Sequence, residues 1–570
     1  MKTSLRWPYA LWLFVGLMTL FAACKDKTPD PGPPVSTVPT IVSIDPATAP
    51  VGSTIAINGT NFNTTPGSNT VSIGGVTATV VTATAGRLVV TVPMGAQNGA
   101  ISVTTGSQTV QSTTTFTVAP SPIKPVVSLQ GTLFQNRTLS KDTIYVLRGY
   151  VYLAADYTMT IAPGTVIKGG GPELDPLGKN AAGTLIVERR GKLVANGTAA
   201  LPIVFTSNKA VGQRKPGDWG GIVLIGKSPT NRPGTLTYFG GVRGTVETYN
   251  EPEDNSGSLQ YVRIEYAGTG QPLVADSKLA GLTLIGVGTG TVISNVQVTQ
   301  SSADAFSWYG GTVNAKYMVA NRTTRANWAT NWGYIGRVQF GVALRDATVA
   351  DPAGSNGIDS QNYDPGENAN GTPLTKLSGL PQTAPIFANI SDFAFNTAPT
   401  AITAASPGLG YYQSGVYLRR NTGFSLYNSL IYGYPEGLRL EGTTTGLAAS
   451  LANGAIDLRG NVFANTLTSA AGSGTITSGT ANTFLTTPAF ANQFVGTGDL
   501  GTLALNGANF NASAPNFVPQ TGSTLLAGAV ASTKLTGGFF VTTTYRGAFG
   551  TDNWTTGWTN FNPQNTDYDR

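Results

Sequence analysis

Residues 280–306 read AGLTLIGVGTGTVISNVQVTQSSADAF. Two short apolar runs alternate with small or polar residues and are separated by glycines, which is typical of half-buried strands joined by a tight turn. The glycines of Gly286–Val292 lie inside this β unit and precede no helical pattern, so they do not form a dinucleotide-binding loop. The stretch predicts one strand–turn–strand unit.

Similar units recur along the chain at irregular spacings of roughly 20–25 residues, as they do in solenoids. They occupy residues 157–170, 183–207, 219–231, 257–268 and 415–434. About 440 residues follow the Pro-rich stretch 119–125, too many for one ordinary globular core. Stacked units bury a continuous core, so we predict a parallel β-helix over residues 126–535.

Asparagine recurs beside several of the short apolar strands. Its side-chain amide tolerates a left-handed backbone at a tight bend and can stack on the amide of the next coil. We predict such a ladder at Asn295, Asn389, Asn428 and Asn461; the alternative is a set of unrelated turn residues.

Several segments resemble a poorly characterised family of secreted or lipidated bacterial proteins. They are TIAPGTVIKGG (160–170), GDWGGIVLIGKSPTN (217–231), LQYVRIEYAG (259–268), FSWYGGTVNAKYMVA (306–320) and YRGAFGTDNWTTGWTNF (545–561). The resemblance implies a right-handed parallel β-helix and says little about activity. We expect the aromatic segment 536–570 to form a cap.

Residues 40–118 alternate apolar residues with Thr and Ser, with turns at Gly59, Gly74 and Gly99, which predicts a compact β-sandwich. PTIVSIDPATAPVGSTIAINGTNF (39–62) resembles the opening of an IPT/TIG immunoglobulin-like domain. Asp45 and Arg87 are the only charged residues between positions 36 and 118. We expect a spacer or interaction module, in a chain whose fold class is all-β.

The N-terminus has the pattern of an export signal. A basic start precedes a short apolar run, Ala10–Phe21, and then small residues. LFAAC (20–24) resembles a bacterial lipobox, which implies cleavage after residue 23 and a lipid on Cys24; an ordinary cleaved signal is the alternative. Multiple acyl chains give stable membrane anchoring. With the Pro-rich tether 24–39 and the hinge 119–125, this predicts an outer-membrane lipoprotein exposed on a Gram-negative cell.

Composition excludes several kinds of chemistry. The chain has no His and one Cys, so Ser-His-Asp and Cys-His arrangements, imidazole metal sites and disulfides are excluded. Charged residues make up 11% of the chain, which argues against nucleic-acid binding. Calcium on oxygen ligands is the cofactor left to consider. The polar stretch 356–371 offers Asp359, Asn362, Asp364 and Glu367 for it; a solvated turn is the alternative.

Two aromatic stretches, 301–311 and 324–336, come together if the coils stack. Aromatic rings on a solenoid face can stack on the apolar faces of sugars. The candidate glycan-stacking residues are Trp308, Tyr309, Trp328, Trp332 and Tyr334, near Asp304; the alternative is that these rings pack a loop onto the helix.

These observations favour a surface lipoprotein that uses its β-helix to bind a glycan or another cell-surface component. A tethered polysaccharide lyase or glycoside hydrolase is the second hypothesis and needs paired carboxylates, or a Lys or Arg base near calcium. A purely structural envelope protein is the third. Arg263 and Glu265 face the same side of a strand, and we expect them to form a surface ion pair.

Overall fold

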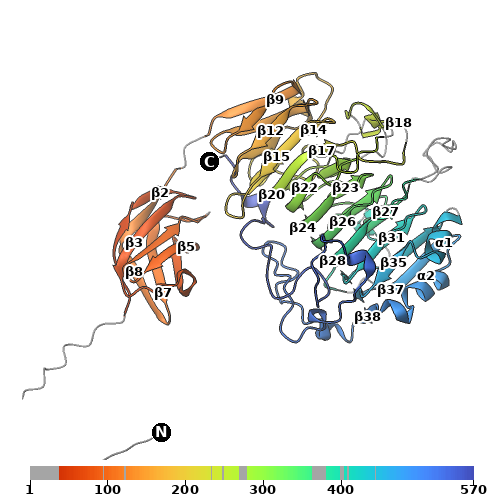
Figure 1. Cartoon of the computed structure of the whole chain (residues 1–570). Helices are drawn as coiled ribbons and strands as arrows, with labels where there is room; N and C mark the ends of the chain where they lie inside the picture. Colours follow the sequence, from red (N-terminus) through yellow and green to blue (C-terminus); the bar gives the residue numbers. More distant parts are fainter. Residues whose placement is uncertain are drawn as a thin grey trace, which may run out of the picture. The chain divides into compact units, whose positions relative to one another are not determined.

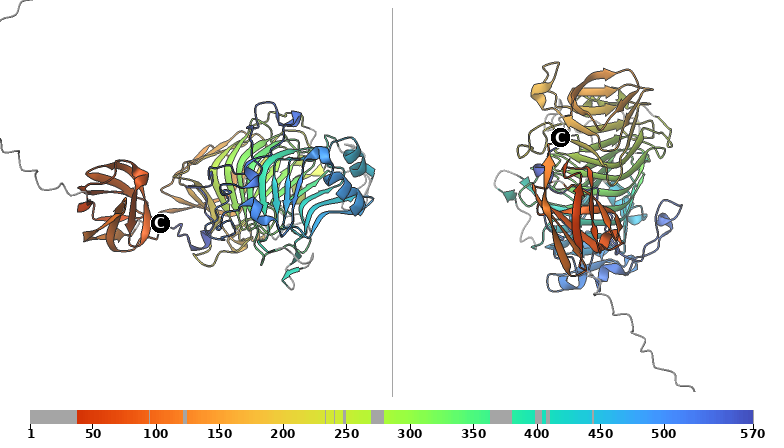
Figure 2. Two further views of the ribbon diagram at one scale, coloured as in Figure 1. Left: turned by 90° about the horizontal axis from the view of Figure 1, so that it is seen from below. Right: turned by 90° about the vertical axis from the view of Figure 1, so that its left-hand side faces the viewer.

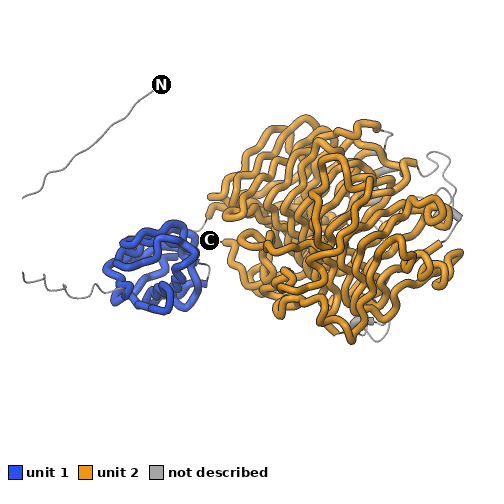
Figure 3. Tube along the Cα trace, turned by 60° about the horizontal axis from the view of Figure 1, so that its bottom comes forward, with its two compact units in different colours: residues 1–122 blue, residues 123–570 orange. Residues whose placement is uncertain are grey.

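The computed structural model describes residues 38–93, 95–120, 124–232, 234–239, 241–246, 249–268, 279–362, 380–397, 404–406, 410–442 and 445–569. The chain divides into two compact units, residues 1–122 and 123–570 (Figure 3). Among the described residues, no helix combines the length and apolar character needed to cross a membrane.

The first unit is an eight-stranded sandwich of the order β1-β3-β6-β5-β4-β7-β8-β2. Its strands are β1 (Thr40–Asp45), β2 (Thr48–Pro50), β3 (Thr54–Thr60), β4 (Asn69–Ile73), β5 (Val76–Thr84), β6 (Arg87–Thr91), β7 (Gly99–Thr105) and β8 (Gln108–Ala119). Strand pairs are antiparallel except β2 with β8. The alternation seen in the sequence places Ile57, Val71 and Phe116 in its core. The immunoglobulin-like prediction is confirmed.

The second unit stacks parallel strands on three faces, called A, B and C (Figures 1 and 2). Face A contains part of β11 (Ile144–Leu153), then β14 (Thr184–Val187), β17 (Gly221–Ile225), β21 (Leu282–Ile285), β23 (Phe306–Tyr309), β25 (Trp328–Asn331), β27 (Ile358–Gln361), β31 (Ser414–Arg419), β34 (Glu436–Gly442) and β37 (Thr468–Gly474). The all-parallel pairing confirms the β-helix prediction.

Faces B and C share five long strands and are completed by shorter ones. The long strands are β20 (Gly257–Glu265), β22 (Val292–Thr299), β24 (Asn314–Asn321), β26 (Arg337–Leu344) and β28 (Ile386–Phe393). Face B adds β10 (Arg137–Leu139), β12 (Thr158–Ile161), β15 (Lys192–Asn196), β32 (Ser425–Tyr427) and β35 (Asp457–Arg459). Face C adds β13 (Val166–Gly169), β16 (Ile203–Ser207), β33 (Leu430–Tyr432), β36 (Val462–Ala464) and β38 (Gln493–Val495), and β9 (Val126–Leu133) pairs with β11.

Shorter elements connect the strands of both units. Two antiparallel pairs are β18 (Gly234–Thr235) with β19 (Thr245–Val246) and β29 (Ala404–Ser406) with β30 (Gly410–Tyr411). The α-helices are α1 (Thr445–Ala452) and α2 (Ser478–Leu485). The 3₁₀ helices span Pro66–Ser68, Pro172–Leu174, Leu236–Phe239, Pro488–Phe490, Leu500–Leu503, Thr524–Leu526, Thr533–Leu535 and Pro563–Asn565.

Each long strand bends between faces B and C at a residue with positive φ. In the five long strands these residues are Tyr261, Asn295, Tyr317, Phe340 and Asn389, and Asn428 and Gly460 continue the column at the corners between β32 and β33 and between β35 and β36. Three of the four predicted ladder asparagines therefore lie at left-handed bends, but Tyr317 and Phe340 interrupt the column between Asn295 and Asn389. The predicted asparagine ladder is therefore not continuous.

The amides also bond differently from the predicted ladder. The Asn428 amide bonds to both the N–H and the carbonyl of Val530, and the Asn389 amide donates to the carbonyl of Gly547. Asn461 is one residue past the bend and donates to the Asn492 side chain at 3.3 Å. An amide-to-amide contact between coils is thus seen at Asn461, and not along the whole column.

The C-terminal segment, residues 530–569, runs back along the flank of the coils and is called the strap (dark blue in Figures 1 and 2). Gln339 exchanges two hydrogen bonds with the backbone of Val541, and Gln297 does the same with Asn560. Further along, Tyr568 donates to Glu265. The segment covers the side of the solenoid and not its end, which corrects the expectation of a cap.

Candidate functional site

Three of the five predicted sugar-stacking rings lie inside the solenoid. Trp308, Trp328 and Tyr334 are each 0% exposed and belong to the central core. Phe306 and Trp328 are register partners on face A, so their rings stack with centroids 5.3 Å apart. Because no face of a fully buried ring is open to a ligand, the stacking prediction is wrong for these residues.

Trp332 and Tyr309 lie on the outer side and contact an insertion, which buries Trp332 and leaves Tyr309 partly buried. Phe239 contacts both rings, with centroid distances of 4.7 Å to Tyr309 and 5.2 Å to Trp332. Arg232 lies over the Trp332 indole, which is 2% exposed. These two rings hold the insertion against face A, which is the alternative that the sequence left open.

Polar residues occupy the outward positions on the later coils of face A, with Ala329 as an apolar interruption. Ser307, Ala329, Asp359, Tyr417 and Arg439 are register partners on successive coils, on the side opposite the core residues Phe306 and Trp328. Parallel neighbours are about 4.8 Å apart, so this column repeats at that interval. We call these residues, with the charged groups beside them, the polar row.

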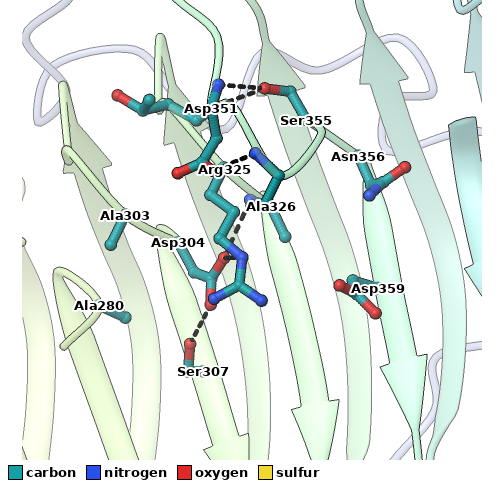
Figure 4. Close-up of polar contacts among 12 residues, drawn as sticks. Ala280, Ala303, Asp304, Ser307, Arg325, Ala326, Asp351, Ser355, Asn356 and Asp359 are labelled. Atoms are coloured by element: carbon teal, nitrogen blue, oxygen red, sulfur yellow. Dashed lines mark hydrogen bonds and ion pairs between the residues drawn. The ribbon is translucent and has the colours of Figure 1, made fainter. Parts of the chain in front are cut away.

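Asp304 and Arg325 begin the polar row (Figure 4). Asp304 accepts hydrogen bonds from the Ser307 hydroxyl at 2.9 Å and from the backbone N–H of Ala326 at 2.9 Å. Arg325 Nε lies 3.8 Å from Asp304 Oδ1. The carboxylate is therefore fixed by its own coil and the next one, and the guanidinium lies beside it.

Asp359 lies on the same outward side, on β27 (Figure 4). It receives two hydrogen bonds from Arg419, at 3.3 Å from Nε and 3.1 Å from Nη2. The Arg419 guanidinium also lies over the Tyr417 ring at 4.8 Å. On the following coil Arg439 pairs with Glu436, whose carboxylate also accepts a 2.7 Å hydrogen bond from Ser414.

The carboxylates of the row keep its arginines cationic. The negative charge of Asp304, with a smaller contribution from Asp359, raises the pKa of Arg325 above its usual value, against the opposing effect of burial. Burial lowers the pKa of Arg419, but the charge of Asp359, the hydrogen bonds to it and the neighbouring Tyr417 together outweigh burial, and the net shift of the pKa is upward. The row is thus an array of fixed charges.

Arg325 differs from Arg419 and Arg439 in its bonding. Its side chain is 24% exposed, and its 3.8 Å approach to Asp304 is longer than a hydrogen bond. Within the part of the chain that the structure describes, no hydrogen bond engages its guanidinium. Arg325 is therefore held in place with donors to spare.

The calcium prediction receives no support from the two residues of its set that are described. Asp359 is engaged by Arg419, and the Asn362 carbonyl oxygen accepts hydrogen bonds from Thr383 and Asn231. Asp364 and Glu367 lie outside the described residues, as does Cys24. Across the described ranges, no group of three or more Asp, Glu or Cys residues is placed to hold a metal ion.

The arginines of the row could not be assigned to one site from the sequence. Arg325 and Arg419 are far apart in the sequence, and the long insertion between β27 and β31 hides their proximity. Arg263 and Glu265 were expected at the surface, but Glu265 is fully buried beneath Tyr568 of the strap, with Arg263 Nε 3.8 Å from its carboxylate. The register of the coils brings the row together, and the aromatic segment 536–570 stood out in the sequence without indicating which coils it covers.

Parallel coils on three faces, with a polar row on one of them, define a β-helix protein. Residues 131–504 match the family described as a pectate-lyase-like β-helix domain, and residues 39–118 match the IPT/TIG domain. The chain belongs to this pectate-lyase-like β-helix family and carries an IPT/TIG domain before it.

Solved structures give only distant similarities. An auxiliary nutrient binding protein from Bacteroides thetaiotaomicron is 20% identical over 17% of this chain and 25% of its own, with a TM-score of 0.15. An auxiliary nutrient binding protein from Bacteroides ovatus is 18% identical over 16% and 24%, with a TM-score of 0.14. The Dettilon tailspike protein is 11% identical over 66% and 62%, with a TM-score of 0.19. The chain thus spans about a quarter of the two Bacteroides proteins, and a search of curated proteins found no match.

Proposed function

We propose that the protein is a surface-anchored lipoprotein whose β-helix binds a glycan along the polar row of face A. The observation that carries the proposal is the Arg325 guanidinium, which lies beside Asp304 with unused donors. A planar guanidinium donates to paired oxygens with defined geometry, as in sugar diols or carboxylates.

The repeat of the row suits an extended ligand. Outward positions recur about every 4.8 Å along the solenoid, so one chain of sugars can contact several coils. The arginines are the more exposed groups of the row: the side chains of Arg325, Arg419 and Arg439 are 24%, 17% and 18% exposed, so each can donate to oxygens of a sugar on its own coil.

The ion pairs favour binding over hydrolysis. Asp359 and Glu436 are each held by two hydrogen bonds from an arginine, and Asp304 is already an acceptor for Ser307 and Ala326. A glycosidase needs one carboxyl free to donate a proton and a second free to attack or activate water. The described residues of the row do not offer that pair.

The location rests on the lipobox resemblance at Cys24 and the Pro-rich tether after it. Two or more acyl chains would hold the protein on a membrane, and an extended tether would keep the β-helix clear of it. The IPT/TIG domain would add length between the anchor and the binding face.

The test is a polysaccharide array probed with the full-length lipidated chain in detergent. Arg325→Ala should weaken the strongest interaction at least tenfold, whereas Arg190→Ala, which removes an exposed arginine elsewhere, should leave it unchanged. A parallel assay follows the release of sugar ends. If wild type releases sugar ends and Arg325→Ala does not, the row is a catalytic site and not a binding site. If Arg325→Ala and Arg190→Ala bind the glycan equally well, the polar row is not the binding site.

A further inference from the structure

A cavity lies over the first coils of face A, away from the polar row. Its volume is about 630 Å³, within the range of small-molecule sites. Tyr150 and Tyr152 of β11 form its floor, and they are two residues apart on one strand, so they face the same side. The loop 175–181 and residues 241–243 provide its walls.

The first wall is a loop built around Asp175. Its carboxylate accepts hydrogen bonds from the backbone N–H groups of Leu177 at 3.0 Å, Lys179 at 2.9 Å and Ala181 at 3.0 Å. Burial would raise the pKa of Asp175, but these hydrogen bonds hold it below its usual value. A Cβ on Gly149 would lie 2.6 Å from this carboxylate, so the glycine permits the loop to approach the floor.

The second wall fits tightly over the tyrosines. A Cβ on Gly241 would lie 2.1 Å from the Tyr150 ring, and the Tyr152 hydroxyl donates to the Gly241 carbonyl at 2.6 Å. The Arg243 guanidinium lies over the Tyr152 ring at 3.4 Å and donates to Thr132 Oγ1 at 3.1 Å. The cavity is therefore shaped before any ligand arrives.

The charged side chains that line the cavity are mostly cationic. Arg148, Lys179 and Arg243 contribute positive charge, whereas Asp175 turns its oxygens to its own loop. Arg148 Nε donates to the Leu174 carbonyl at 3.1 Å, which fixes that side chain at the rim. A tyrosine floor under a cationic rim combines an apolar platform with anion recognition.

We propose that this cavity is a second binding site, for a sugar that carries a carboxylate. The sugar ring rests on Tyr150, since the Arg243 guanidinium covers the Tyr152 ring, and the sugar carboxylate meets Arg243 and Lys179. The Tyr150 hydroxyl and Gln130 are placed for the remaining sugar hydroxyls, because the Tyr152 hydroxyl already donates to Gly241. The site shares no residue with the polar row, so it stands whether or not Arg325 binds a glycan.

The experiment titrates the full-length chain in detergent with methyl glucuronide and, as the neutral match, methyl glucoside, by calorimetry. The glucuronide should bind at least tenfold more tightly. Lys179→Gln, which alters an exposed side chain, and Arg243→Gln should each weaken glucuronide binding at least fivefold, with unchanged melting temperature for Lys179→Gln. Arg190→Gln and Arg325→Ala should leave it unchanged.

Equal binding of the two glycosides, or full affinity in the Lys179→Gln variant, would overturn the proposal. So would tighter binding of a methyl glucoside sulfate than of the glucuronide, because the group recognised would then not be a carboxylate. Loss of binding in Arg325→Ala would assign the glucuronide to the polar row. If the protein binds methyl glucuronide but no polysaccharide on the array, the proposed function of the polar row fails and the cavity proposal stands.

Discussion

The Trp328 indole stacks on the Phe306 ring with planes 6° from parallel, and it donates from Nε1 to the buried Asp392 carboxylate at 3.0 Å. The two rings occupy equivalent positions on adjacent coils, since they are register partners. Trp328 thus fills the core and satisfies a buried acceptor at the same time.

Trp328→Ala should destabilise the β-helix by about 3–5 kcal/mol, because it opens a large cavity. Trp328→Phe keeps an aromatic ring but removes one hydrogen-bond donor to Asp392. It should therefore lower the free energy of unfolding by less, about 1–3 kcal/mol. Denaturant unfolding of the two variants measures both. An unchanged unfolding midpoint in Trp328→Ala would contradict the core assignment.

The Asp346–Arg322 pair should make stability depend on pH. Burial would raise the pKa of Asp346, but hydrogen bonds from Thr348 and Arg322 and the charge of Arg322 lower it overall. Its contribution is complete above about pH 3.9, the unfolded value, and is lost as pH falls through the lower folded pKa. Melting curves between neutral and acidic pH should converge for wild type and Asp346→Asn; parallel curves would contradict the shift.

The strap should contribute to the stability of the whole second unit. Trp558 is 1% exposed and packs edge-on against Tyr261 with centroids 5.9 Å apart. Trp558→Ala should lower the free energy of unfolding of the second unit by about 3–5 kcal/mol, because it leaves a cavity under the strap. Tyr568→Phe, which removes one hydrogen bond to Glu265, should cost about 1 kcal/mol. If both variants have the melting temperature of wild type, the strap does not contribute to the stability of the second unit.

If Cys24 is lipidated as proposed, Cys24→Ala should release the protein from membrane fractions or leave an unprocessed precursor, because acyl chains on Cys24 would supply the affinity for the bilayer. Fractionation followed by mass measurement of the N-terminus tests this. Full maturation and unchanged membrane association in the variant would exclude lipidation at Cys24.

The class of fold follows from local patterns in the sequence, but the position of its side chains does not. Alternation and glycine punctuation are local, so the sandwich and the coils were predictable. Whether Trp308 points in or out depends on strand register, which shifts by one residue without changing composition. The prediction that the Trp308 ring lies at the surface is therefore wrong, because the ring points into the core.

The polar row required knowledge of which residues stack. Arg325, Asp359 and Arg419 come together through register across long insertions, and an irregular spacing conceals such partners. The cavity over the first coils depends on an approach between Gly149 and Asp175 that no local motif announces. Contacts between distant segments are the part that single-sequence reasoning did not reach.

The strap also has a consequence for the order of folding. Coils of a solenoid contact only their neighbours, so the early coils can form while later parts of the chain are still being synthesised. Asp569 of the strap nevertheless pairs with Lys168, 401 residues earlier in the chain. The flank over faces B and C therefore stays open to water until the strap itself has been synthesised and can pack against it.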